Sequence, residues 1–185
     1  MLHVYENPEK VLDITEPTDE RGVAPVHPCR IVMAGPAGCG KRNLALNLLK
    51  RLQLRFDKWS VLTLDKKTTE WQKIEDQPGF RLFSWDDSKD RLPPLSEFTQ
   101  KDGRSVLLID EAPFSRLGRE RLSQLERLFA HGSSHGSLSL IIMHQKCTSI
   151  PIEIRNNCQY FCLWATPMKP CMRYFEDMLG LPIRQ

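Results

Sequence analysis

The chain has 185 residues, of which 41% are hydrophobic and 26% are charged, and this suits one globular domain with a substantial core. Its formal net charge of +3 is too small to indicate a nucleic-acid partner by itself. No apolar run approaches the length of a membrane-spanning helix, and the N-terminus lacks the apolar region of a signal peptide. We therefore expect a soluble, intracellular protein with no membrane partner.

The six cysteines form no CxxC pair, so the sequence gives little support for a zinc site. Cys158 and Cys162 are expected to lie on a strand. We interpret the cysteines as small buried side chains in a reducing compartment.

The predicted elements begin after a polar, proline-rich lead-in at residues 1–28, and residues 29–185 form the main domain. The first predicted strand is Arg30–Ala34, followed by a glycine-rich turn and a helix that reaches about Leu54. Further strands are predicted at Trp59–Leu64, Phe80–Trp85, Ser105–Glu111, Leu138–Met143 and Tyr160–Trp164. Further helices are predicted at Thr68–Ile74, Leu95–Gln100, Arg119–Phe129 and Met168–Leu179, and a loop at His131–Gly136.

Strands that alternate with helices predict an α/β fold with a mainly parallel sheet and helices on both faces. The run Ser105–Glu111 is apolar almost throughout and ends in two acids, as expected for a buried central strand of such a sheet.

A candidate phosphate-binding loop lies between the first strand and the first helix. It consists of Gly35, Pro36, Ala37, Gly38, Cys39, Gly40, Lys41 and Arg42. This pattern and its strand–turn–helix setting are typical of a Walker A P-loop, in which backbone N–H groups and a lysine bind the phosphates of ATP. An ordinary glycine turn is the alternative, and the setting favours nucleotide binding over it.

Polar residues end two of the predicted strands, where ligands bind in a parallel sheet. Asp110 is placed to hold Mg²⁺, and Glu111 is placed to polarise the water that attacks the γ-phosphate of ATP. Gln145 follows the next strand and could sense that phosphate. Each residue alone could equally be a solvated strand end, but their order after the P-loop favours a catalytic pair, Glu111 and Gln145, with Asp110 as the metal ligand.

Four segments carry a resemblance to a known family: VMAGPAGCGKRNLALNLL, VLLIDEAP, LFAHGSSHGSLSLIIMHQ and IPIEIRNNCQYFCLW. The chain resembles the poxvirus-type genome-packaging ATPases of large DNA viruses and their relatives in Maverick/Polinton-like elements, within the HerA/FtsK group. The resemblance implies a RecA-like P-loop fold, a homo-oligomeric ring, and ATP-driven movement of double-stranded DNA into a capsid. It also implies contact with a capsid protein, in the host nucleus or at a viral assembly site.

Two departures from the family pattern concern hydrolysis. Arg42 stands where the family usually has the Ser or Thr that binds Mg²⁺. The family's basic loop before the sensor strand corresponds here to His131–His135, which has no arginine. Other cations are Arg155, a candidate for a subunit contact, and a group expected on a solvated helix face: Arg116, Arg119, Arg121 and Arg127.

These departures leave alternatives open. Arg42 either points away, with water in place of the hydroxyl and Asp110 still holding Mg²⁺, or pairs with Asp110 or a phosphate and replaces the metal. The first alternative leaves a slow ATPase, and the retained Asp110, Glu111 and Gln145 favour it. The chain is accordingly expected to be a packaging ATPase or a nucleotide-binding assembly subunit without hydrolysis. A cellular P-loop kinase or helicase fragment is a third possibility, which the absence of an arginine-rich lid disfavours.

Overall fold

The apolar runs of the sequence form the strands of one parallel sheet in a computed structural model. The structure describes residues 25, 27–52, 56–72, 74–76, 78–85 and 91–164. The strands are β1 (Arg30–Ala34), β2 (Lys58–Thr63), β3 (Phe80–Ser84), β4 (Ser105–Asp110), β5 (Leu138–His144) and β6 (Tyr160–Leu163). They form a six-stranded sheet in the order β3-β2-β4-β5-β1-β6, and each neighbouring pair is parallel.

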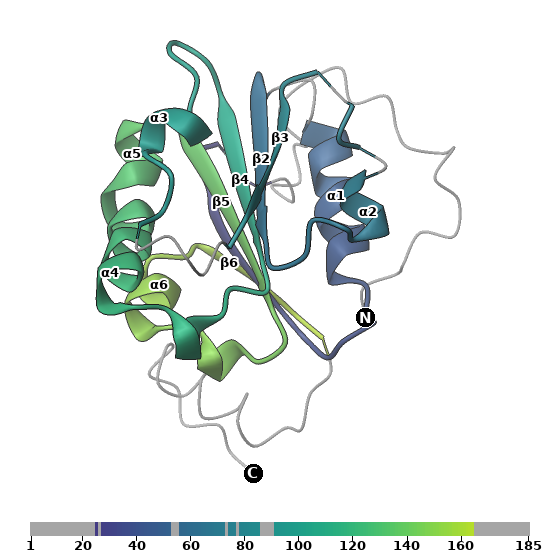
Figure 1. The fold of residues 1–185 in the computed structure, drawn as a ribbon, viewed down its shortest axis with the longest axis vertical. Coiled ribbons are helices and arrows are strands. Elements are labelled where there is room, and N and C mark those ends of the chain that lie inside the picture. The colour runs from purple at the N-terminus through teal and green to yellow at the C-terminus, as the bar shows by residue number, and fades with distance from the viewer. Residues whose placement is uncertain are drawn as a thin grey trace.

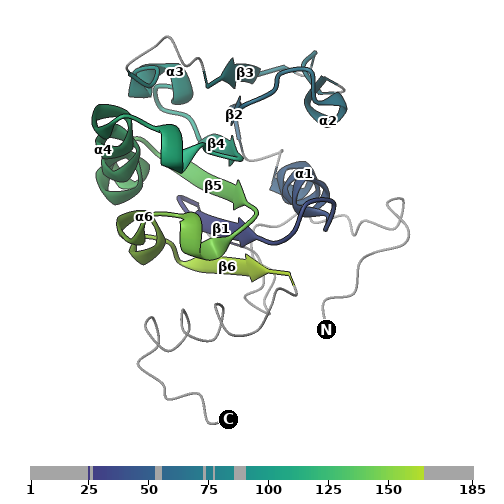
Figure 2. The same cartoon turned by 60° about the horizontal axis from the view of Figure 1, so that its bottom comes forward.

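Helices cover both faces of this sheet (Figures 1 and 2). On one face lie α1 (Lys41–Leu52) and α2 (Thr69–Gln72). On the other lie α3 (Leu95–Phe98), α4 (Arg119–Arg127), α5 (Ser133–His135) and α6 (Ile152–Asn156). Short helical turns, at Phe114–Arg116, Leu128–Gly132 and Cys147–Ser149, complete the described elements.

Alternate residues of β1 serve two separate hydrophobic cores, because successive strand side chains point to opposite faces. Ile31 and Met33 pack with Ala45 and Leu49 of α1. Val32 and Ala34 belong to the core on the α4 and α6 side, which contains Leu125, Phe129 and Ile154. Residues of β1 and β5 contribute to both cores, and the packing of the two strands positions the start of the glycine-rich loop.

Most of the sequence-based elements are confirmed, with boundaries that differ by a residue or two. The loop predicted at His131–Gly136 is wrong. A helical turn at Leu128–Gly132 continues α4, and α5 follows directly. The buried Ser133 hydroxyl donates to the Leu138 carbonyl at 2.7 Å, so a local hydrogen bond stabilises the helical path that the composition does not favour.

Other expectations have mixed outcomes. Arg121 is buried rather than solvated, with 7% of its surface exposed, because long cationic side chains can lie along apolar surface. Cys162 lies on β6, but Cys158 follows α6 and is not on a strand. Burial raises the pKa of the Cys158 thiol to about 12, consistent with an inert thiol. The predicted helix Met168–Leu179 and most of the lead-in lie outside the described residues.

Candidate nucleotide-binding site

The glycine-rich loop connects the carboxyl end of β1 to the first turn of α1. The Gly35 N–H donates to the His144 carbonyl at 3.1 Å and so anchors the loop to β5. A Cβ at position 35 would lie 2.7 Å from the Cβ of Trp164 and 2.8 Å from the sulfur of Cys39. The close approach of these side chains therefore requires glycine at this position.

Two further glycines give the loop its path into the helix. Gly38 has a φ of 73° and Gly40 a φ of 95°, in the left-handed region that other residues rarely adopt. Pro36, Ala37 and Gly38 are exposed, and α1 begins directly after Gly40. The loop thus presents backbone and a helix N-terminus to solvent, an arrangement that suits an anion.

Lys41 folds back over the loop instead of extending into solvent. Its amine donates to the carbonyls of Gly35 at 2.7 Å and Pro36 at 2.9 Å, and only 7% of its side chain is exposed. The amine also lies 3.8 Å from Oε1 of Glu111. The amine of Lys41 and the carboxylate of Glu111, which directly follows β4, therefore lie close together, as expected from the sequence.

Asp110 is held by two donors that meet at one of its oxygens. Arg42 Nε donates to Oδ2 at 2.9 Å, and the indole N–H of Trp71 donates to the same oxygen at 2.9 Å. Asp110 is 2% exposed and Trp71 is fully buried, while Arg42 is 37% exposed. The Arg42 guanidinium also approaches Glu70, with Nη1 and Oε1 4.0 Å apart. Arg42 therefore pairs with Asp110 in this structure, and its replacement of the metal stays a prediction.

This arrangement does not fit a magnesium ion beside Asp110. Mg²⁺ requires oxygen ligands in octahedral geometry. Here position 42 offers no hydroxyl, and Oδ2 of Asp110 already accepts from a cation and an indole. Among the residues that the structure describes, no three side chains of His, Cys, Asp or Glu cluster as a metal site. The assignment of Asp110 to Mg²⁺ stays a prediction.

Glu111 adopts a backbone conformation that returns its side chain toward the loop. Its φ is 52°, which is uncommon for a residue other than glycine. Its N–H donates to the Met143 carbonyl at 3.0 Å, which holds the turn against β5. The geometry places a carboxylate beside Lys41, at the edge where the phosphates of a nucleotide would lie.

The electrostatics of Glu111 favour its protonated form relative to an ordinary glutamate. Burial raises its pKa, and the neighbouring Asp110 carboxylate adds to the rise. The positive charges nearby, on His144, Lys41 and Arg42, lower the pKa but do not cancel the effect of burial. A carboxylate with a raised pKa is a better proton acceptor, so the site suits general-base chemistry.

Gln145 lies directly after β5, as the sequence indicated, and its role as a sensor stays a prediction. Gln145 is exposed just beyond β5, whereas the half-buried His144 is the last residue of that strand. The His144 ring lies 5.5 Å from the Phe114 ring, and its charge acts on Glu111. The structure therefore brings together Lys41, Arg42, Asp110 and Glu111, with His144 acting electrostatically on Glu111.

Sequence reasoning missed Trp71, Glu70 and His144. A buried tryptophan needs a partner for its indole N–H. The sequence therefore indicates that Trp71 has a hydrogen-bond partner, but it does not indicate which residue that partner is. Glu70 precedes it on α2 and offers no signal of its own. His144 follows the predicted strand Leu138–Met143, and the sequence analysis assigned it no function.

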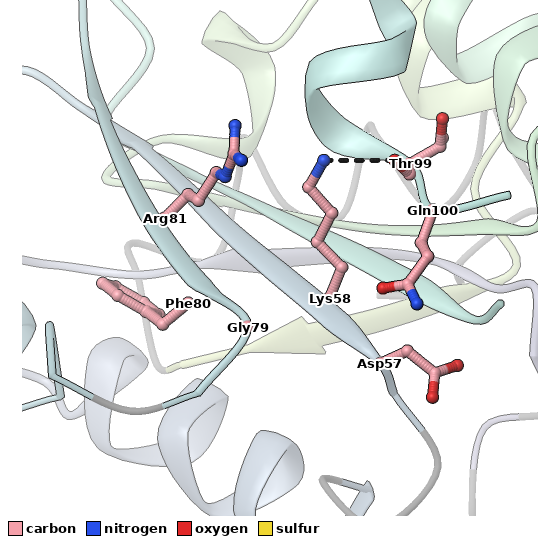
Figure 3. Close-up of a pocket in the computed structure, with 7 residues that line it drawn as sticks. All are labelled: Asp57, Lys58, Gly79, Phe80, Arg81, Thr99 and Gln100. Carbon is pink, nitrogen blue, oxygen red and sulfur yellow. Dashed lines mark hydrogen bonds between the residues drawn. The ribbon is translucent and has the colours of Figure 1, made fainter.

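The described hollows of the surface lie at the opposite edge of the sheet from this site. One, of about 370 Å³, is lined by Asp57, Lys58, Gly79, Phe80, Arg81, Thr99 and Gln100 (Figure 3). In it, the Lys58 amine donates to the Thr99 carbonyl at 3.1 Å. A second, of about 790 Å³, shares Thr99 and Gln100 and extends to His135. Neither contains a residue of the P-loop.

Comparison with solved structures identifies the fold. The chain matches the genome-packaging NTPase B204 of Sulfolobus turreted icosahedral virus 2 in complex with AMP, with a TM-score of 0.65 and 15% identity over 84% of each chain. It matches the AMPPCP complex of B204 with a TM-score of 0.60 and 15% identity, over 82% of each chain. The chain has the RecA-like fold of P-loop ATPases.

A second protein, EssC, is similar as well. The cytoplasmic domain of EssC matches with a TM-score of 0.60 and 15% identity, over 85% of this chain and 34% of that one. No family model matches the sequence. No curated protein matches it either. In the part of the chain that the structure describes, no helix is both long and apolar enough to cross a membrane.

Proposed function

We propose that this protein is the ATPase of a DNA-packaging motor, acting on double-stranded viral DNA at a capsid. One observation carries the proposal. The amine of the loop lysine, Lys41, lies 3.8 Å from the carboxylate of Glu111, so the phosphate-binding and base groups of an ATPase meet at one edge of the sheet. The similarity to B204, a packaging NTPase, supports the choice of DNA as the substrate that is moved.

Each residue of the site has a distinct part in the proposed chemistry. The loop Gly35–Gly40 and the first turn of α1 bind the phosphates, because the loop is exposed at Pro36–Gly38 and leads into the N-terminus of a helix. Lys41 leaves the loop carbonyls when a nucleotide arrives and neutralises the β- and γ-phosphates. Glu111 accepts the proton of the attacking water, and Gln145 contacts the γ-phosphate from the end of β5.

DNA binding is proposed to be a property of an assembled ring rather than of a single chain. A formal charge of +3 gives one chain little attraction for phosphates, whereas a ring adds the fields of its copies. Binding should therefore ignore sequence and weaken steeply with salt. Tight, sequence-selective binding by a monomer would contradict this. We place the motor in the host nucleus or at a viral assembly site, in a reducing compartment.

A second candidate function is favoured by the ion pair between Arg42 and Asp110. An acid whose Oδ2 accepts from a permanent cation at 2.9 Å is a weaker ligand for a metal than a free carboxylate. In this version the chain binds a nucleotide and assembles with the capsid machinery but does not hydrolyse ATP.

ATP turnover measured with and without double-stranded DNA, in Mg²⁺ and in EDTA, tests the proposal. Mg²⁺ is included because phosphoryl transfer in P-loop ATPases ordinarily uses it. Turnover that DNA stimulates supports the motor. Nucleotide binding without any turnover supports the assembly subunit, and no nucleotide binding at all contradicts both.

A further inference from the structure

Arg42 and Trp71 together occupy the place at which a metal ion would meet Asp110. Their N–H groups come from the first turn of α1 and from α2, and both end 2.9 Å from the same carboxylate oxygen. Asp110 is 2% exposed, so this oxygen has little access to water or to a hydrated ion. The arrangement is therefore built from two separate elements around one buried charge.

We propose that the Arg42 guanidinium replaces the divalent cation, so that the site binds a nucleoside triphosphate free of metal. This inference rests on the proposed nucleotide binding at the loop. A guanidinium stays charged at any relevant pH and presents five N–H donors that match phosphate oxygens. Arg42 follows Lys41 directly and is 37% exposed, so part of its side chain remains accessible beside the loop.

The neighbours of Arg42 explain why a metal does not compete well for this place. A cation bound to Asp110 would displace the guanidinium from a buried carboxylate and would face the positive end of the Trp71 indole N–H. Arg42 would then be left with Glu70 alone, whose carboxylate is 4.0 Å away and partly solvated. If the guanidinium left without a replacement cation, the buried Asp110 carboxylate would keep only the Trp71 N–H as a partner, so the pair is expected to persist when a metal-free nucleotide binds.

Calorimetry with ATPγS, on the wild-type protein in Mg²⁺ and in EDTA, tests the inference without any variant. We expect dissociation constants that agree within about threefold in the two buffers. Binding that requires Mg²⁺, or that strengthens by more than about tenfold when it is added, overturns the inference and leaves the proposed function intact. No binding in either buffer contradicts the proposed function itself.

Two substitutions at the same position sharpen the result. Arg42→Thr supplies the missing hydroxyl and releases Asp110, so its affinity should fall by about tenfold or more in EDTA and recover in Mg²⁺. Arg42→Lys keeps the charge and should remain insensitive to metal. Circular dichroism confirms that both fold. Equal metal dependence of Arg42→Thr and wild type shows that Arg42 does not replace the ion.

Discussion

The two edges of the sheet differ in how they hold their charged side chains. At the carboxyl edge, Lys41 and Arg42 of α1 contact Asp110 and Glu111 at the end of β4, and Asp110 is only 2% exposed. At the amino edge lie the two hollows described above, and the ion pair there, Arg81 with Glu97, is 56% and 45% exposed. Buried charge, not the size of a hollow, therefore marks the candidate site.

The largest expected effect is that of Lys41→Ala. It removes the charge that we assign to the β- and γ-phosphates, so ATP binding should fall below detection in calorimetry. The matched control is Lys58→Ala, which removes a lysine from the amino edge and should leave the affinity unchanged. If ATP binds the two variants equally well, the comparison between the edges fails.

Glu111→Gln should abolish turnover while leaving ATP bound. The amide keeps the shape of the side chain but cannot accept the proton, and general-base catalysis typically contributes about a hundredfold to ten-thousandfold in rate. Single-turnover hydrolysis measures the loss, with Glu97→Gln at the amino edge as control. Equal turnover by the wild type and Glu111→Gln would show that Glu111 is not the base.

Arg42→Thr should raise Mg²⁺-dependent turnover by about tenfold or more, on the order of 1.4 kcal/mol of barrier. The substitution restores a hydroxyl and frees Asp110 from its cation. Steady-state turnover against Mg²⁺ concentration measures the change. An unchanged rate would mean that the ion pair does not limit hydrolysis.

The raised pKa of Glu111 predicts a pH dependence of stability. Between the ordinary glutamate pKa and the raised value, the folded state binds more protons than the unfolded state, so stability falls as the pH rises through this window. Glu111→Gln has no titrating carboxylate at this position and therefore removes this pH-dependent loss of stability. Its melting temperature should exceed that of the wild type at neutral pH, and the difference should shrink below the unfolded-state pKa. Thermal unfolding across the pH range checks the sign.

Arg81→Gln should have the smallest effect. The Arg81–Glu97 pair is exposed at 2.8 Å, and exposed pairs contribute about 0.2–1 kcal/mol. Denaturant unfolding should therefore shift only slightly, and ATP affinity should not change. A large loss of ATP affinity would place a ligand at the amino edge instead.

The sequence was sufficient for the fold because its strands are long apolar runs and its loop has a diagnostic spacing. Asp110 and Glu111 were identifiable since they end such a run. Asp110 as the partner of Arg42 was one of the alternatives that the sequence left open. The second donor to Asp110, Trp71, was not identifiable, because that contact depends on where α2 packs. His144 was assigned no function because the predicted strand ended at Met143, one residue before the observed end of β5. That one residue decides which side chain stands at the end of the strand.

The preference for a loop at His131–Gly136 failed for a different reason. Local composition favoured irregular structure, but the continuation of α4 and the Ser133 hydrogen bond to Leu138 determine the observed helix. Intrinsic propensity is a weak guide when packing and a buried hydrogen bond favour another conformation.

The backbone of Glu111 has a consequence for the directed evolution of this protein. Its φ of 52° and its half-buried carboxylate both make glutamate an unfavourable choice for folding at that position. A library screened for heat resistance alone should therefore enrich Gly or Asn there, and the survivors should be robust but inert. A screen that also selects for turnover should retain the glutamate and acquire stabilising substitutions at other positions. Sequencing the two pools would therefore distinguish residues required for folding from residues required for catalysis.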